Sequence, residues 1–184
     1  MDITGRLVRL RPVRPEDAPR MVECLADPRV VYHLAHWALL PYSLEQAQQW
    51  VANDQPDALR WAIECRADGE YVGGTGLHNI SHFNRHCSFG IWIGPPERWG
   101  RGYGTETCKL AVEYAFRHLA MEKVSLCVFS GNDRARRSYK KAGFVSEGVM
   151  RREFWRDGDL VDVETMAVFR DNPVYAERIA ISGA

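Results

Sequence analysis

The fold is decided by the sequence Trp99-Gly100-Arg101-Gly102-Tyr103-Gly104-Thr105, which follows an apolar strand-like run and opens a segment with helical spacing. Its three glycines at alternate positions let the backbone approach a ligand closely and adopt unusual φ and ψ angles. Their amides, with the N-terminus of the following helix, form a cradle suited to an anion such as a pyrophosphate. A tight strand-to-helix connection without a ligand is the structural alternative. The pattern favours phosphate binding by a strand–loop–helix unit.

Two other phosphate-binding motifs do not fit this loop. A dinucleotide fingerprint has the spacing G-x-G-x-x-G near a first strand, whereas this loop reads G-x-G-x-G late in the chain. A P-loop requires Gly-Lys followed by Ser or Thr, and the sequence has no such triplet. The sequence therefore supports neither NAD nor ATP as a ligand.

A second notable segment runs from Asn132 to Phe144. Asn132 is a good N-cap and Gly143 a good C-terminal stop for a helix over residues 133–142. Tyr139 lies on the same face of that helix as two alanines, so we expect its ring to point inward or across a cleft. A core tyrosine with a satisfied hydroxyl is the structural alternative.

Helical and strand patterns alternate along the chain in the order β-α-α-β-β-β-α-β-α-β-β. The expected strands cover residues 7–11, 61–65, 71–80, 87–93 and 124–129, followed by a hairpin that turns at Asp157-Gly158. The expected helices cover residues 15–26, 105–119 and 133–142, and a further helix starts at Ser43 with a capping box. This order predicts an α/β fold of the α+β kind, a mixed sheet with helices packed on it.

The composition is that of an ordinary globular domain. The 184 residues are 46% hydrophobic and predict a single domain over 1–184, with a core of about 7–169 and a short tail over 170–184. Lys and Arg total 24 against 24 Asp and Glu, so the basic excess of a nucleic-acid binder is lacking. The five cysteines are widely spaced, which argues against a disulfide framework and against a zinc site. No signal-peptide pattern or membrane-length apolar run is present, so we expect a cytoplasmic protein.

The two segments together resemble the cofactor motifs of the GCN5-related N-acetyltransferase (GNAT) superfamily. Its R/Q-x-x-G-x-G/A loop maps on residues 99–104, with Trp99 where Arg or Gln is usual, and its N-x-x-A-x-x-x-Y-x-K-x-G-F pattern is matched from Asn132 to Phe144. Within the superfamily, the chain is similar to the ribosomal-protein-alanine-acetyltransferase-like branch, which also includes spermidine acetyltransferases. The shared features are Leu-x-x-Leu-Arg-Pro near the start, Gly-Tyr-Gly-Thr-Glu at a helix start, and a Gly-x-x-Arg…Asp-Gly hairpin. The likeness covers about Leu7 to Phe169.

The resemblance implies a central, mostly antiparallel sheet with splayed strands and a site for acetyl-CoA. The strand at residues 89–93, with Ile91, Trp92 and Ile93 at its end, would pair with the pantetheine arm of the cofactor, and a strand amide would polarise the thioester carbonyl. The loop would hold the pyrophosphate through Gly100, Arg101, Gly102, Gly104 and Thr105. Trp99 and Tyr103 of the same loop are also expected to bind the cofactor. Asn132 would contact the cofactor, and Lys140 is our choice from a basic helix face for its 3′-phosphate.

The implied reaction is transfer of an acetyl group to a primary amine, by direct attack in a ternary complex. Tyr139 would protonate the departing thiolate, because a phenol with a pKa of about 10 is protonated at neutral pH. A non-catalytic acyl-CoA-binding or sensing module on the same fold is the alternative. The acceptor stays open among a protein N-terminus, a polyamine and an amine-bearing antibiotic, and a homodimer stays open as well.

Residues on the acceptor side are less sharply indicated. Tyr32, His33, Trp37 and His78 are our candidates for substrate binding, and each has a structural reading as a core aromatic or a surface histidine. The candidates for a general base are His33, His36, Glu64, His78, His82 and His86. We expect no metal, because no third ligand accompanies any histidine pair at suitable spacing.

Overall fold

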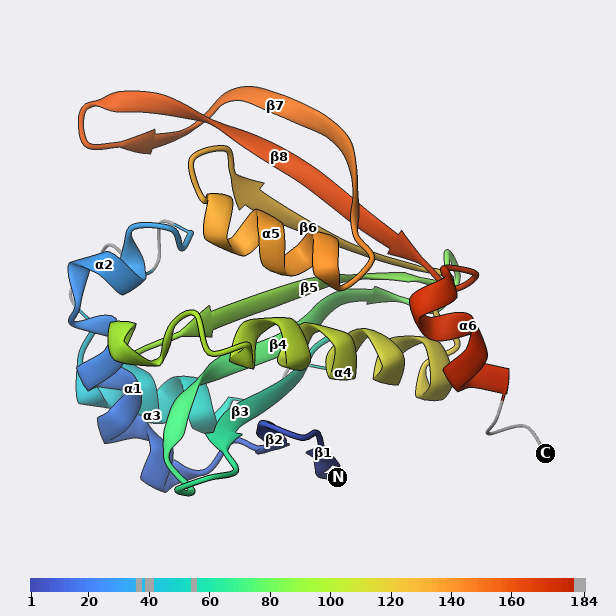
Figure 1. Ribbon diagram of the computed structural model, residues 1–184. Helices are drawn as coiled ribbons and strands as arrows, with labels where there is room; N and C mark the ends of the chain where they lie inside the picture. Colours follow the sequence, from blue (N-terminus) through green and yellow to red (C-terminus); the bar gives the residue numbers. More distant parts are fainter. Residues whose placement is uncertain (36–37, 39–41, 54–55, 181–184) are drawn as a thin grey trace. The chain divides into compact units, whose positions relative to one another are not determined.

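Short apolar runs bounded by turn residues form the strands of the molecule, as their alternation predicts. The computed structural model describes residues 1–35, 38, 42–53 and 56–180 (Figure 1). The strands are β1 (Ile3–Thr4), β2 (Val8–Pro12), β3 (Leu59–Cys65), β4 (Tyr71–Ser81), β5 (His86–Ile93), β6 (Lys123–Phe129), β7 (Val145–Arg156) and β8 (Asp159–Phe169).

The helices begin where capping residues and prolines predict them. Ser43 accepts a hydrogen bond from the amide of Gln46, which completes the predicted capping box. The α-helices are α1 (Ala18–Leu25), α2 (Pro28–Val31), α3 (Leu44–Ala52), α4 (Tyr103–His118), α5 (Asp133–Lys141) and α6 (Pro173–Ala180). Two 3-10 helices, η1 (Pro15–Asp17) and η3 (Pro96–Arg98), precede α1 and α4.

The strands form one eight-stranded sheet in the order β1-β2-β3-β4-β5-β6-β8-β7. β1 with β2, β2 with β3, β6 with β8 and β7 with β8 pair antiparallel. β5 and β6 pair parallel, and their ladder runs only from His86 with Lys123 to Ser88 with Ser125. β6 continues to Phe129 and remains paired with β8 along its whole length. The open, mostly antiparallel sheet with a short parallel ladder confirms the predicted α/β fold with splayed strands.

Contacts divide the chain into two compact parts, and β4, β5 and α4 each contribute to both. The first part comprises residues 1–76 and 91–107. Its interior includes Val8 and Leu10 of β2, Ile63 of β3 and Met21 of α1, all nearly or fully buried. Met21 also belongs to a cluster with Ala62, against which Trp92 packs. This part carries the glycine loop between β5 and α4.

The second part comprises residues 77–90 and 108–184. Its core is built from one face of α4 and from the strands β6 and β8, with Val112, Phe116, Val124 and Met166 fully buried. Figure 1 shows α5 next to the β6–β8 pair, and a bond from Arg136 of α5 to β8 ties the helix there. The hairpin β7–β8 turns at Asp157-Gly158 with φ of 49° and 88°, as the predicted type I′ turn requires.

Within the described residues, one strand and two α-helices lie where the sequence predicted none. β1 adds two residues to the edge of the sheet, α2 forms one turn after Asp27, and α6 occupies the segment expected as a tail. Helical spacing predicts that one side of this helix carries Leu110, Ala111, Tyr114, Ala115 and His118. The buried side of α4 differs from that prediction, because His118 is exposed while Cys108 and Phe116 are buried. The prediction placed that face one residue out of phase, which a 3.6-residue period readily allows.

Candidate functional site

The predicted site residues fall into two groups, one in each part of the chain. The loop half-site comprises residues 91–105, from the end of β5 to the start of α4, within the first part. The helix half-site comprises Phe89 and residues 132–144, within the second part.

The backbone of the loop half-site has the form of an anion cradle. Gly100 and Gly102 have φ of 75° and 89°, in the left-handed region that glycine adopts without steric cost. A Cβ on Gly100 would meet nothing within 4 Å, so the loop is open on that side. α4 begins directly after these glycines, at Tyr103. The amides of the loop and of the helix start therefore suit a pyrophosphate, as the sequence predicts.

Side-chain bonds fix the conformation of the loop half-site. The indole nitrogen Nε1 of Trp99 donates to the carbonyl oxygen of Ile93 at 2.7 Å. The hydroxyl of Tyr103, which is buried, lies 3.3 Å from the Sγ of Cys65. Trp99 thus has a structural role at the position where the GNAT motif usually carries Arg or Gln. It closes the loop onto the last residue of β5.

Arg98 connects the loop half-site to the turn between β3 and β4. Its Nη1 lies 2.7 Å from Asp68 Oδ2, and its Nη2 pairs with Glu70. The guanidinium beside Asp68 lowers the pKa of that carboxyl to about 2. These two salt bridges were not predicted from the sequence, because 28 and 30 residues separate Arg98 from its partners and no local pattern links them.

The end of β5 packs tightly against β4 within the first part. A Cβ on Gly73 would lie 2.2 Å from the carbonyl oxygen of Trp92, and one on Gly74 would lie 2.8 Å from the Trp92 indole nitrogen. The Trp92 ring also lies 5.9 Å from the ring of Tyr71. Ile91, Trp92 and Ile93 are all half-buried. This packing orders the strand end that the resemblance assigns to the pantetheine arm.

The helix half-site begins and ends as predicted. The side-chain oxygen of Asn132 accepts a hydrogen bond from the amide of Ala135 at 3.2 Å, so this residue caps α5. Gly143 follows the helix with φ of 87°, the usual conformation of a residue that ends a helix. The Asn132 side chain is half-buried, and Lys140 is exposed on the helix surface.

Tyr139 lies on the buried face of α5. Its ring packs edge-on against Phe89 at a centroid distance of 6.3 Å and lies 6.0 Å from the ring of Phe144. Burial raises the pKa of Tyr139 above its ordinary value of 10.0, and nearby Cys108 raises it further. The phenol is therefore neutral throughout the physiological pH range. The contact with Phe89 places Tyr139 next to β5, just beyond the last pair of the ladder with β6.

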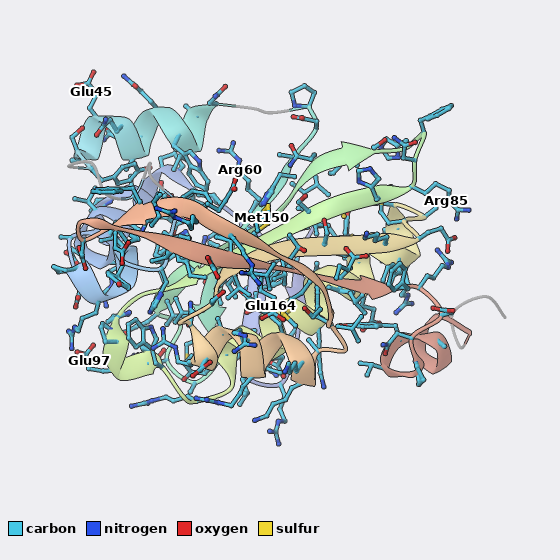
Figure 2. All side chains as sticks on the ribbon, turned by 90° about the horizontal axis from the view of Figure 1, so that it is seen from above. Glu45, Arg60, Arg85, Glu97, Met150 and Glu164 are labelled. Atoms are coloured by element: carbon cyan, nitrogen blue, oxygen red, sulfur yellow. The ribbon has the colours of Figure 1, made fainter. Side chains whose placement is uncertain are left out.

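The basic face of α5 is partly engaged within the second part. The Nε of Arg136 donates to Glu164 Oε2 at 2.6 Å, and its Nη1 lies 3.0 Å from Asp133. Figure 2 labels Glu164 on β8, where its side chain is largely covered. Arg136 is thus a structural residue, whereas Lys140 keeps an exposed position.

The candidate acceptor residues that the structure describes belong to both parts of the chain. Tyr32 and His33 follow α2, and their rings pack edge-on with a centroid distance of 4.9 Å. His78 of β4 lies over Gly90 of β5, because a Cβ there would be 2.7 Å from its ring. Trp37 and His36 lie outside the described residues. The structure brings Tyr32 together with His33 within the first part, and His78 belongs to the second.

Glu64, a candidate base, is held in a network of charges. Its Oε2 accepts a hydrogen bond from Arg11 Nε at 2.7 Å, and its Oε1 lies 3.5 Å from Arg9. Arg11 also makes a bidentate, buried pair with Asp17 at 2.7 and 2.9 Å. The remaining candidates, His82 and His86, lie in and just after the turn between β4 and β5.

The cysteines do not form a reactive centre. All five are free thiols, and Cys127 alone is exposed among them. Burial raises the pKa of Cys24 to about 11 and that of Cys87 to about 12, so both remain protonated near neutrality. Among the described residues, no group of three His, Cys, Asp or Glu side chains is arranged to hold a metal ion. In the same residues, no helix is both long and apolar enough to span a membrane.

Comparison with known proteins places this geometry in a family. A family model described as "Acetyltransferase (GNAT) domain" matches residues 7–145. Spermidine N(1)-acetyltransferase of Escherichia coli K12 is 34% identical over 167 residues, covering 89% of this chain and 86% of that protein.

Two solved structures have the same fold. One is spermidine N-acetyltransferase from Vibrio cholerae in complex with CoA and spermine, with a TM-score of 0.81 and 24% identity, covering 91% of this chain and 98% of that chain. The other is RimL, a ribosomal L7/L12 alpha-N-protein acetyltransferase in complex with coenzyme A. Its TM-score is 0.82 at 18% identity, and the match covers 92% of this chain and 98% of that chain. At these identities the likeness establishes the fold alone.

Proposed function

Because this chain is an N-acetyltransferase of the GNAT family, we propose that it transfers the acetyl group of acetyl-CoA to a primary amine by direct attack. The observation that carries the proposal is Tyr139, a buried neutral phenol on a helix that matches the family motif in full. The spermidine enzyme and RimL, each solved with CoA, support the choice of cofactor.

We assign the two half-sites to one molecule of acetyl-CoA. The open side of the loop at Gly100 fits the pyrophosphate, and the amides of Gly102, Gly104 and Thr105 are the donors that would hold it. The end of β5 at Ile91–Ile93 would hold the pantetheine arm through its main chain. Asn132 would donate its side-chain amide, since its oxygen is used as the cap of α5. Lys140 would meet the 3′-phosphate from the exposed face.

The proposed step needs one nucleophile and one acid. Acetyl-CoA supplies a thioester whose carbonyl carbon accepts the neutral amine. The N–C bond forms, the C–S bond breaks, and Tyr139 donates its phenolic proton to the sulfur that leaves. The surplus proton of the amine passes to water, and Tyr139 regains a proton from solvent. Tyr139 has a proton to donate at neutral pH, because its phenol is protonated there.

Direct attack is favoured over an acyl-enzyme on cysteine. A cysteine nucleophile reacts as thiolate and is usually activated by a lowered pKa. In this chain burial raises the pKa of Cys108, which neighbours Tyr139, and raises the pKa of Cys24, Cys87 and Cys127 as well. The buried Cys65 shares a hydrogen bond with Tyr103. The thiols therefore act as small apolar side chains.

For the acceptor we propose a primary amine, either of a polyamine or of a protein N-terminus. The polyamine class is supported by the 34% identity with the Escherichia coli spermidine enzyme. Acidic residues in the β7–β8 hairpin, such as Glu153 and Asp159, are consistent with it. The fold shared with RimL supports the N-terminal class. A panel of spermidine, spermine and short peptides with free N-termini, assayed by release of free CoA thiol, separates the classes.

The test of the mechanism is the variant Tyr139→Phe, assayed with the best acceptor of that panel. We expect kcat to fall about 100-fold or more, as for loss of a general acid, while the Kd for CoA stays unchanged. Tyr114→Phe, which removes a phenol from α4, is the matched control and should keep wild-type kcat. An unchanged kcat in Tyr139→Phe would remove the general-acid assignment. CoA binding without turnover on any amine would instead favour a sensing module.

A further inference from the structure

Glu106, in the first turn of α4, receives three main-chain amides from the start of the chain. Its Oε1 accepts from the amide of Arg6 at 2.9 Å, and its Oε2 accepts from Leu7 at 2.6 Å and Val8 at 2.8 Å. Hydrogen bonds to an ionised carboxylate are about twice as strong as neutral ones. A side chain that makes three of them ties two distant segments together.

The segment Gly5–Val8, between β1 and β2, is itself held from its other side. The amide of Gly5 donates to the carbonyl oxygen of Val8 at 2.9 Å, which closes the turn. Arg66, after β3, donates its Nη1 to the carbonyl oxygen of Gly5 at 2.9 Å, and its amide donates to that of Leu7 at 3.0 Å. We name Gly5–Val8 the N-terminal turn. Its donors and acceptors are thus shared between Arg66 and α4.

The N-terminal turn also contacts the glycine loop. A Cβ on Gly102 would lie 3.1 Å from Leu7 Cδ1, so the loop passes directly over the Leu7 side chain. The main-chain amide of Glu106 donates to the carbonyl oxygen of Gly102 at 3.0 Å. Glu106 therefore holds Gly102 with its backbone and the N-terminal turn with its side chain. All of these residues belong to the first part of the chain.

We propose that Glu106 is a positioning residue for the cofactor, acting through the N-terminal turn to hold the glycine loop in its pyrophosphate-binding shape. The inference rests on the proposed function, since it concerns the same loop. A loop already in its bound conformation loses less entropy when the ligand binds. Glu106 would not touch the cofactor, because both of its carboxylate oxygens are used by the N-terminal turn.

The negative charge of Glu106, taken alone, predicts the opposite effect on CoA affinity, so the two roles can be told apart by experiment. A carboxylate close to an anion site repels the anion, so a residue acting only through its charge would weaken CoA binding in the wild type. Removing that charge would then tighten binding, and the gain would shrink at high salt. Removing a positioning residue would weaken binding at every salt concentration. The two roles therefore predict changes of opposite sign.

The experiment is isothermal titration of coenzyme A into wild type and Glu106→Gln, at low and high salt. Glutamine has one acceptor oxygen, and its NH2 group cannot accept a hydrogen bond. At least one of the three main-chain donors would therefore face another donor. We expect Kd for CoA to rise about tenfold, the effect of losing roughly one charge-assisted hydrogen bond. Glu113→Gln, which removes an acid from the same helix, is the matched control and should change Kd by less than about twofold.

Each outcome decides the inference. Tighter binding, or an unchanged Kd, in Glu106→Gln would overturn it while leaving the proposed function intact. Absence of CoA binding by the wild type would overturn both. If Glu106→Gln fails to fold, Arg66→Met tests the same turn from its exposed side and should raise Kd about threefold by loss of one bond. Unchanged binding in that folded variant would count against the inference in the same way.

Discussion

Tyr103 and Tyr139 both occur in segments predicted to bind the cofactor, and both are buried, yet their surroundings differ. The hydroxyl of Tyr103 lies beside the Sγ of Cys65 and ties the glycine loop to β3. Tyr139 is surrounded by aromatic rings, and burial raises its pKa. A sequence motif assigns each position, but the burial that keeps one phenol protonated is set by distant residues such as Phe89.

The Arg98–Asp68 pair predicts a dependence of stability on pH. Hydrogen bonding by Arg98 lowers the pKa of Asp68 from 3.8 to about 2. A carboxylate with a lowered pKa stabilises the folded state above its unfolded pKa and loses that contribution as pH falls through the folded pKa. We expect the Tm of the wild type to fall more steeply than that of Asp68→Asn between about pH 4 and about pH 2.

Thermal unfolding followed by circular dichroism measures this difference. Asp57→Asn, at an exposed position, should follow the wild-type curve. If the Tm of wild type and of Asp68→Asn fell in parallel with pH, the ion pair would contribute nothing to stability. Many exposed ion pairs make no measurable contribution.

At the scale of elements, α6 fixes the C-terminal end of the helix that carries Tyr139. The hydroxyl of Tyr175, a fully buried residue, donates to the carbonyl oxygen of Ala142 at 2.8 Å. Asn172 donates its side-chain amide to the carbonyl oxygen of Gly143 at 3.2 Å. The Tyr175 ring also packs edge-on against Phe116 of α4 at 5.4 Å. Residues after β8 therefore complete the core of the second part.

Tyr175→Phe removes the hydroxyl and keeps the ring. We expect the free energy of unfolding to fall by about 1–2 kcal/mol, because the Ala142 carbonyl loses its buried partner. Urea unfolding measures the change. Tyr32→Phe removes a hydroxyl from a residue that is 41% exposed and should leave the free energy within about 0.5 kcal/mol of wild type. An equally small change in Tyr175→Phe would show that α6 is held by packing alone.

Elements with local signals were predictable, and elements without them were not. The capping box at Ser43, the cap at Asn132 and the Asp157-Gly158 turn each depend on neighbouring residues, and the structure confirms all three. β1 has only two residues and exists because β2 pairs with it. α6 begins at Pro173, but what holds it is the contact of Tyr175 with Ala142, more than 30 residues away. A local pattern carries no information about such partners.

Across the molecule as a whole, the sequence motifs of the site were predictable, whereas the residues that hold the glycine loop in place were not. The loop at residues 99–105 and the helix at 132–144 were identified from spacing and from the family resemblance. The residues that hold the loop, Arg98 and Glu106, were missed because their partners lie 28 to 100 residues away. The acceptor side carries no motif, so its residues stay as candidates.

We propose that the glycine loop and the Asn132 helix bind one coenzyme A together, and calorimetric titration of CoA tests this proposal. Gly100→Ala adds a methyl group to the open side of the loop, and Asn132→Ser keeps a capping oxygen while removing the amide donor. We predict one CoA per wild-type chain and a Kd raised about tenfold by each variant. Absence of binding, or a Kd that either variant leaves unchanged, would contradict the claim.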